Sequence, residues 1–221
     1  MPNQKLSKDT VHRVIIRNMK EQDIPKIVEL QKASFPHMAT EGVYWKPHQL
    51  EAHLKVFPEG QFCAEYEEKI IGSCSSLIMT LVPEYKEHTW LEACGDSFFK
   101  NHNIKGDSLY AADVSTHPRY RRLGIASKLY NARKQLAIKL NLRRIIAGGR
   151  LFNYCEHEKE MTPLEYVQKV IKKEIKEPVL SFQLRNGFKF IKILHNYLKD
   201  PRSLNYATFI EWKNPHYVKT R

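Results

Sequence analysis

The feature that most constrains the fold is the stretch HPRYRRLGIASKLY, residues 117–130. An arginine-rich loop with one glycine, Gly124, is followed at once by apolar residues at three- and four-residue spacing. That spacing predicts an amphipathic helix of about four turns, and the β-rich run before it, 108–116, predicts a strand. A basic loop at a strand-to-helix junction indicates an α/β fold that binds an anion there.

Three interpretations of this loop are open: a solvated basic surface, a nucleic-acid-binding surface and a cradle for a phosphate ligand. The window 119–150 contains ten Lys or Arg and no Asp or Glu, within a chain of formal charge +12, and such a field attracts anions. The start of a helix offers unpaired backbone N–H groups to a phosphate. Gly124 and Ala126 are small and leave room for that ligand. Their place at the predicted start of the helix favours the third interpretation, a cradle for a phosphate ligand.

The rest of the chain predicts an α/β fold with a mixed sheet. A strand over 11–19 precedes a helix that starts at Asp23 and ends before Pro36. Thr162 and Glu165 predict a capping box at the start of a later helix. The other expected elements are a helix (47–57), a hairpin (61–69 and 69–82), a strand (108–116), a helix (125–140), a strand (143–149), two helices (162–177 and 178–187) and two strands (188–194 and 206–213).

One domain is expected over residues 1–221, with 83–107 as an insertion between strands and 151–177 as an inserted loop plus helix. No secretory signal is seen in MPNQKLSKDT, and no apolar segment is long enough to cross a bilayer. The four cysteines form no C-x-x-C pair, which argues against a compact zinc site, and the missing secretory signal argues against a disulfide framework. The cluster CEHE (155–158) is not expected to bind a metal, because four adjacent side chains cannot all face one ion. We expect a cytoplasmic protein.

Residues Arg121–Ala126 match the motif [RQ]-x-x-G-x-[GA], and the order of elements around them extends over essentially the whole chain. In both respects the sequence resembles the GNAT superfamily of acyl-CoA-dependent N-acyltransferases. The resemblance implies a mixed, mostly antiparallel twisted sheet flanked by helices, with the phosphate-cradling loop at a strand-to-helix junction. The segments RRIIAGGR, MTPLEYVQKV and EPVLSFQLRNGF resemble, more narrowly, the GNAT domain fused ahead of a carbon–nitrogen hydrolase in some bacterial proteins.

The resemblance implies acetyl-CoA as the donor and a primary amine, on a small molecule or a peptide, as the acceptor. Backbone of the motif strand is expected to pair with the pantetheine arm, and main-chain amides of the loop are expected to bind the pyrophosphate. The strand residues are Val114, Ser115 and Thr116, and the loop residues are Arg121, Arg122, Leu123, Gly124, Ile125, Ala126 and Ser127.

The catalytic groups are less sharply defined. Relatives often have a tyrosine as general acid where this chain has Gln183, and glutamine cannot supply that proton. Tyr154 or Tyr197 is then the expected acid, or solvent assists the departing thiolate. The candidates for the base are Asp113, which has a structural role in the sheet as its alternative, then Glu41, and in third place His117.

Two other functions remain open at this stage: a domain that binds acyl-CoA without turnover and regulates a partner hydrolase, and a nucleic-acid-binding protein. The second is disfavoured because no surface aromatics of the single-strand-binding kind are interleaved with the basic residues. A homodimer is left open. Two further groups of side chains are expected mainly outside the site. Surface charge is expected of Arg133, Lys134, Lys139 and Arg143, with contact to the CoA 3′-phosphate as the alternative. Local packing is expected of Trp90, Phe98 and Phe99, with a substrate cage as the alternative.

Overall fold

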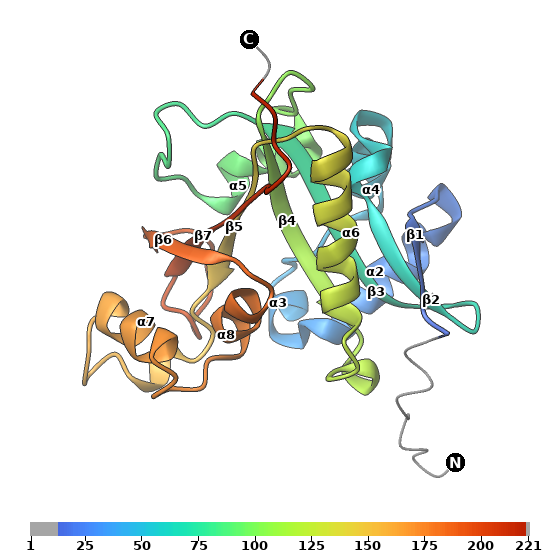
Figure 1. Ribbon diagram of the computed structural model, residues 1–221. Coiled ribbons are helices and arrows are strands. Elements are labelled where there is room, and N and C mark those ends of the chain that lie inside the picture. Colours follow the sequence, from blue (N-terminus) through green and yellow to red (C-terminus); the bar gives the residue numbers. More distant parts are fainter. Residues whose placement is uncertain (1–12, 220–221) are drawn as a thin grey trace, which may run out of the picture. The chain divides into compact units, whose positions relative to one another are not determined.

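The computed structural model describes residues 13–219 (Figure 1). Hydrogen bonding arranges seven strands in the order β1-β2-β3-β4-β5-β7-β6. The pairs β1–β2, β2–β3, β5–β7 and β6–β7 are antiparallel, and β4–β5 is parallel. The expected mixed, mostly antiparallel sheet with flanking helices is therefore confirmed.

The described chain divides into two compact units. Strands β3 and β4 and helix α6 contribute to both. Unit 1 consists of residues 13–76, Ser97–Phe99 and Asp113–Leu136, and unit 2 consists of Leu77–Asp96, Lys100–Ala112 and residues 137–219.

Unit 1 contains a β-hairpin whose turn is built from two glutamates. The hairpin joins β2 (Phe62–Tyr66) to β3 (Lys69–Met79), and Tyr66 pairs with Lys69 across it. Glu67 and Glu68 both have positive φ, as the two central residues of a tight hairpin turn must. Strand β1 (Ile15–Asn18) pairs with β2. The strand expected over 11–19 is thus shorter, and residues 11 and 12 lie outside the described residues.

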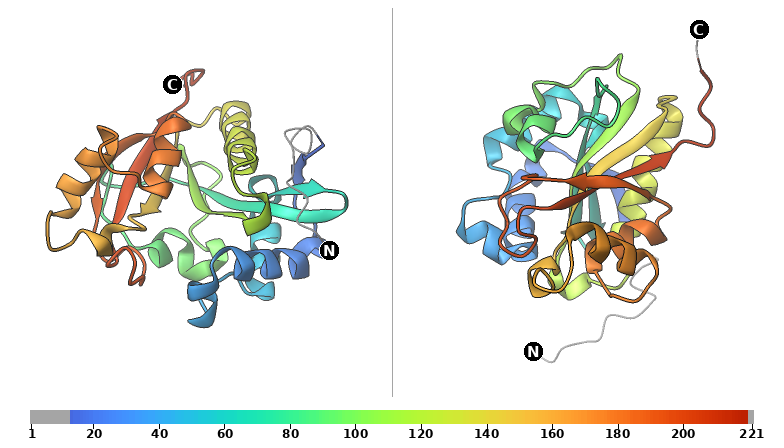
Figure 2. Two further views of the ribbon diagram at one scale, coloured as in Figure 1. Left: turned by 90° about the horizontal axis from the view of Figure 1, so that it is seen from below. Right: turned by 90° about the vertical axis from the view of Figure 1, so that its left-hand side faces the viewer.

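The helices of unit 1 are α2 (Ile24–Ser34), α3 (Pro36–Thr40), α4 (Pro47–Val56) and the first part of α6 (Ile125–Lys139). Figure 2 shows α6 and α2 on opposite sides of the β2–β3 hairpin. Helix α2 ends before Pro36 as expected, but Pro36 starts a further helix, because proline is favoured in a first turn. Asp23 precedes α2 without capping it, and its carboxylate accepts hydrogen bonds from Arg17 instead.

Unit 2 is built on β5 (Arg144–Arg150), β7 (Ala207–Lys213) and β6 (Lys189–Leu194). Helices α7 (Pro163–Ile171) and α8 (Pro178–Arg185) belong to the same unit (Figure 1). The expected capping box is confirmed, since Thr162 and Glu165 bond each other's backbone amides. The helix expected over 162–177 was too long. A φ of +66° at Lys173 ends it, within a charged stretch that lacks an apolar face.

The segment 83–107 is more regular than the sequence pattern indicated. It contains the short helix α5 (Trp90–Ala93), capped by the Thr89 side chain, and a wide helical turn, Gly95–Phe99. Strand β4 (Ser108–Thr116) follows and leads to the arginine loop.

Candidate active site

The arginine loop begins where β4 ends, in unit 1. Pro118–Tyr120 form one turn of 3₁₀ helix, and the ring Nδ1 of His117 accepts the Arg119 N–H at 3.3 Å. Arg122 and Gly124 then adopt left-handed conformations, with φ of +64° and +75°. Two such residues in a stretch of three turn the chain sharply enough for α6 to start at Ile125.

Apolar side chains of the loop fix it to the core. Ile125 is buried with Leu129 against the strands, and Leu123 and Tyr120 pack on the same cluster. Gly72 of β3 permits this close approach, since a Cβ at that position would collide with Ile125. The turn is therefore held from beneath, and its backbone is left on the surface.

The loop surface is positively charged and sterically open. Among the described residues, no ion pair to a carboxylate is found for Arg119, Arg121 or Arg122, while Arg121 Nη2 donates to the Ser34 carbonyl at 2.7 Å. Burial and the charges of Arg119 and Arg121 lower the pKa of His117. A Cβ added to Gly124 would meet nothing within 4 Å. The first-turn amides of α6 have no acceptor within the helix, so an anion can approach them.

Asp113 lies on β4 in unit 1, where its carboxylate is a hydrogen-bond acceptor inside the sheet. Its Oδ1 accepts the Ser75 N–H at 2.9 Å, and the Trp45 side chain also bonds it. Burial raises the pKa of Asp113, although the nearby Arg133 and these hydrogen bonds oppose the rise. A carboxylate with a raised pKa is a better proton acceptor at neutral pH than an exposed one.

The expectation that Arg133 is surface charge was wrong. Its side chain is 1% exposed and reaches between β3 and β4. The guanidinium donates to Ser76 Oγ at 2.9 Å, to the Ser75 carbonyl at 2.8 Å and to the Asp113 carbonyl. A position on an amphipathic helix does not reveal this, because the apolar stem of arginine packs like an aliphatic side chain.

The other candidates are distributed over the chain. Glu41 lies in unit 1 and is exposed. It is the C-terminal cap of α3, a helix that the sequence pattern did not predict. Tyr154 belongs to unit 2 and is buried. Its hydroxyl donates to the Met161 carbonyl at 3.0 Å, and burial raises its pKa. Asp113, Glu41 and the arginine loop therefore belong to the same unit. Tyr154 belongs to the other unit, and its hydroxyl is used in a structural hydrogen bond.

Two adjacent glycines of β5 accept side chains from elsewhere in unit 2. A Cβ on Gly148 would overlap the ring of Tyr197, and a Cβ on Gly149 would overlap the carboxamide of Gln183. Gln183 is 4% exposed, and within residues 13–219 its Oε1 has no hydrogen-bond donor. The pair of glycines in RRIIAGGR was the available signal for these contacts.

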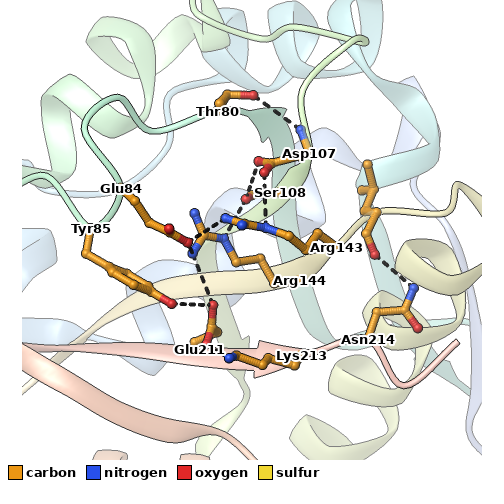
Figure 3. Close-up of polar contacts among 11 residues, drawn as sticks. Thr80, Glu84, Tyr85, Asp107, Ser108, Arg143, Arg144, Glu211, Lys213 and Asn214 are labelled. Carbon is orange, nitrogen blue, oxygen red and sulfur yellow. Dashed lines mark hydrogen bonds and ion pairs between the residues drawn. The ribbon is translucent and has the colours of Figure 1, made fainter. Parts of the chain in front are cut away.

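An ionic cluster lies elsewhere in unit 2 (Figure 3). The buried Arg144 binds Glu84 and Glu211 through Nη1, at 2.8 and 3.1 Å, and Tyr85 donates to Glu211 at 2.9 Å. Arg143, which was expected to be surface charge, is partly exposed and binds Glu84 at 2.6 Å. A cavity of about 220 Å³ lies beside the cluster. Each cation of the cluster already has a carboxylate partner. We therefore interpret the cluster as a structural ion-pair network that holds residues 83–87 against β5 and β7.

Neither a metal-binding cluster nor a membrane-spanning helix is found among the described residues. No group of three or more His, Cys, Asp or Glu side chains is placed to hold a metal ion there. No helix in that part of the chain has the length and apolar character needed to span a bilayer.

Comparison with protein-family models matches residues 24–154 to the acetyltransferase (GNAT) family. The matched region is more than half of the chain, and it includes the arginine loop and Asp113. The chain belongs to the GNAT acetyltransferase family.

Two proteins of similar sequence come from Bacillus subtilis (strain 168). The uncharacterized N-acetyltransferase YkwB is 40% identical over 204 residues, which cover 92% of this chain and 90% of YkwB. The probable hydrolase YhcX is 49% identical over 207 residues, which cover 93% of this chain and 40% of YhcX. The chain therefore spans less than half the length of YhcX, in agreement with the narrower resemblance to a domain within a longer hydrolase.

Solved GNAT-like structures share the fold at low sequence identity. The loading GNATL domain of CurA from Lyngbya majuscula has a TM-score of 0.78 at 19% identity, over 92% of this chain and 98% of that domain. The GphF GNAT-like decarboxylase in complex with isobutyryl-CoA has a TM-score of 0.75 at 16% identity, over 90% of this chain and 99% of GphF.

Proposed function

We propose that the protein is an N-acetyltransferase that moves the acetyl group of acetyl-CoA to a primary amine. The observation that carries the proposal is the arginine loop. Its left-handed Arg122 and Gly124 open the α6 N-terminus to solvent beside three arginines without carboxylate partners among the described residues. Membership of the GNAT family supports an acyl-CoA donor, and the acetyl group and the amine are the specific parts of the proposal.

In this proposal the loop binds the CoA pyrophosphate through main-chain amides. The amides are those of Arg121 to Ser127, and the arginine side chains add a favourable field. The backbone of Val114, Ser115 and Thr116 pairs with the pantetheine arm as an additional strand would. The acyl group then lies further back along β4, next to Asp113.

Asp113 is the base we propose for the transfer. The amine nitrogen attacks the thioester carbonyl, the N–C bond forms, and the C–S bond breaks to release the CoA thiolate. Overall the substrate ammonium loses two protons and the thiolate regains one, so one proton is released. The raised pKa of Asp113 suits it to accept the first proton, and Glu41 and His117 remain the alternative bases.

No side-chain acid is assigned to the thiolate. Gln183 can donate a hydrogen bond but no proton, and Tyr154 already donates to the Met161 carbonyl. The thiolate of CoA is a good leaving group compared with an alkoxide, so hydrogen bonding and solvent protonation suffice in this proposal. No disulfide joins the cysteines of the described residues, and we retain the cytoplasm as the proposed location.

The cradle is tested by a matched pair of glycine variants, Gly124→Val and Gly42→Val. Both glycines are exposed and have nearly the same positive φ, +75° and +74°, so the backbone strain is the same in each variant. By calorimetry with acetyl-CoA, we expect Gly124→Val to lose binding and Gly42→Val to retain it. Equal affinities in the two variants contradict the cradle.

A second candidate is decarboxylation of a carboxyacyl-CoA. GphF is described as a decarboxylase, and this chain has Gln183 where many acetyltransferases have an acidic hydroxyl. In that reaction the bond to the carboxylate carbon breaks, CO₂ leaves, and the resulting enolate carbon takes a proton, which a protonated Asp113 could donate. Incubation with malonyl-CoA then yields acetyl-CoA without release of a thiol.

Three measurements separate the candidates. Thiol release with acetyl-CoA across a panel of amines supports the acetyltransferase, and conversion of malonyl-CoA to acetyl-CoA supports the decarboxylase. Calorimetric binding of acyl-CoA with neither reaction supports the third candidate, a regulatory acyl-CoA-binding domain that partners a hydrolase. Absence of any acyl-CoA binding contradicts all three.

A further inference from the structure

Trp45 lies in unit 1, in the loop between α3 and α4, and its backbone and its ring are each held in place. The backbone N–H donates to Gln31 Oε1 at 2.9 Å. The residue is 3% exposed, and its ring meets those of His53 and Phe99 edge to face, with centroids 4.6 and 5.9 Å away. Such contacts stabilise an aromatic pair beyond the area that it buries. The indole is therefore fixed in one orientation.

His53 supports this orientation without adding a charge. Its ring is fully buried and stacks on Phe99, with centroids 3.7 Å apart and planes 9° from parallel. Its Nε2 lies 2.9 Å from the Ser97 carbonyl, and because a carbonyl only accepts, Nε2 carries the proton. Burial lowers the pKa of His53 to about 4. The aromatic support of Trp45 is therefore neutral near pH 7.

The indole N–H of Trp45 donates to the carboxylate of Asp113 on β4, which belongs to the same unit. A tryptophan side chain has this one donor and no acceptor, so the direction of the bond is fixed. Ser75 on β3 donates to the same carboxylate, through its side chain and through its N–H, which lies 2.9 Å from Oδ1. The carboxylate is therefore held both from the neighbouring strand and from the α3–α4 loop.

Two ionisable side chains act on the Asp113 carboxylate, Arg133 from α6 and Cys74 from β3. Burial raises the pKa of Cys74 to about 11, so this thiol is uncharged near pH 7. Burial also raises the pKa of Asp113, while the charge of Arg133 and the hydrogen bonds from Trp45 and Ser75 lower it. The indole N–H thus offsets part of the desolvation of the anion.

We infer that Trp45 is a positioning residue, whose indole N–H orients the Asp113 carboxylate and stabilises the ionised form that accepts a proton. The inference rests on the proposed function, because it takes Asp113 as the base. It adds the residue that adapts a buried carboxylate to this role. A hydrogen bond to the charged form of an acid favours that form, and the fixed ring determines which way the carboxylate faces.

The first test measures the pKa of Asp113 directly, by NMR titration of protein with isotope-labelled aspartate side chains. Asp113→Asn identifies the signal by its loss. Trp45→Phe keeps an aromatic ring but removes the donor. Because a hydrogen bond to a charged group is strong enough to move a pKa by about one unit, we expect the pKa of Asp113 to rise by that amount.

Two variants control for a merely structural role of Trp45. Phe99→Leu loosens the packing of the indole but keeps its N–H, and Trp212→Phe makes the same substitution on β7 in unit 2. Both should leave the pKa of Asp113 at the parent value. Replacement of Trp45 by benzothienylalanine keeps the shape of the indole and exchanges its N–H for sulfur, so it tests the donor even where Trp45→Phe does not fold. An unchanged pKa of Asp113 after loss of the donor overturns the inference and leaves the proposed function standing.

The second test follows the pH dependence of kcat/KM for thiol release from acetyl-CoA, with one amine of the panel that reacts. A general base must be ionised, so the acid side of the profile reports its pKa. The pKa of the amine is common to both proteins, and we expect the acid side to move to higher pH in Trp45→Phe together with the NMR titration. A profile that stays in place while the NMR titration moves shows that Asp113 is not the base and overturns the role of Trp45. No thiol release by the parent protein with any amine contradicts the proposed function, and this inference with it.

Discussion

The Tyr110 hydroxyl lies 2.8 Å from the Tyr197 hydroxyl, although the two residues are 87 positions apart in the chain. His88 extends the contact, with Nε2 at 3.1 Å from Tyr110 and Nδ1 at 2.8 Å from the Lys86 carbonyl. Burial lowers the pKa of His88, so the ring is neutral, and Nδ1 must carry the proton that the carbonyl accepts. Tyr110 therefore donates to His88, and Tyr197 donates to Tyr110. With this direction of donation, each hydrogen bond from Tyr197 through Tyr110 and His88 to the Lys86 carbonyl has one donor and one acceptor.

This order predicts unequal costs for removing the two hydroxyls. Tyr110→Phe leaves His88 Nε2 without a donor and the Tyr197 hydroxyl proton without an acceptor, whereas Tyr197→Phe removes the donor to Tyr110, which keeps its own bond to His88, and the acceptor of the Gly148 backbone N–H. We expect losses of about 1–3 kcal/mol in unfolding free energy, larger for Tyr110→Phe, and a double variant that loses less than the sum. Urea denaturation of the four proteins measures the coupling. Strict additivity contradicts the hydrogen-bonded order.

The two glycines of β5 predict different responses to added methyl groups. Gly148→Ala places Cβ into the ring of Tyr197, which is rigid and hydrogen-bonded, while Gly149→Ala meets the flexible carboxamide of Gln183. We expect Gly148→Ala to cost at least about 3 kcal/mol and Gly149→Ala distinctly less. The added variant Gln183→Ala should restore stability to Gly149→Ala and should not rescue Gly148→Ala. Thermal unfolding followed by circular dichroism measures both effects, and the reverse pattern of rescue contradicts the contacts assigned here.

The fold and the loop could be predicted because their determinants are local. The periodicity of α6, the β-rich run before it and Gly124 between them all lie within one continuous stretch, residues 108–139. The capping box at Thr162 is local in the same way, since its two partners are three residues apart. Such features depend on backbone conformation and spacing, which a sequence pattern reports directly.

The features that the sequence did not reveal depend on contacts between distant segments. Arg133 looks like a surface cation on a helix, and only its burial against Ser75 and Asp113 shows its role in the sheet. Trp90 was expected to be local packing, but its ring bonds Ala112, 22 residues away. The end of α7 was misplaced for a different reason: the left-handed residue that stops it, Lys173, has no sequence signal comparable to glycine.

Asp113→Asn tests the proposed base. The amide oxygen of asparagine can still accept the Ser75 N–H, so the sheet contact is retained while the proton acceptor is lost. We expect kcat/KM for acetyl transfer to fall by about 10²–10⁴, with little change in acetyl-CoA affinity.

Burial raises the pKa of Asp113, so ionisation of this group lowers the stability of the parent as the pH rises above the usual range of aspartate. The variant should therefore be at least as stable as the parent at pH 8. Glu29→Gln, an exposed substitution on α2, is the control. Full activity of Asp113→Asn shows that Asp113 is not the base and leaves Glu41 and His117 as the candidates.

Glu177 predicts a pH dependence of stability that is separate from catalysis. This buried carboxylate caps α8 by accepting the Leu180 N–H, and it also accepts the Phe152 N–H at 3.1 Å. Burial outweighs these bonds and raises the pKa of Glu177 from 4.5 to about 7. The folded state therefore holds a proton that the unfolded chain has released. The stability contributed by this group is complete below about pH 4.5 and is lost as the pH rises to about 7. The loss is on the order of 3 kcal/mol.

Glu177→Gln removes the titration, so its unfolding free energy should vary less than that of the parent between pH 5 and pH 8. Glu165→Gln is the matched control at the start of α7. Bonds from Thr162 lower the pKa of Glu165, so its contribution is lost only on acidification, and this variant should follow the parent between pH 5 and pH 8. Guanidinium denaturation at four pH values measures the three curves. A parent protein that gains stability from pH 5 to pH 8 relative to Glu177→Gln shows that the carboxylate is ionised in the folded state throughout.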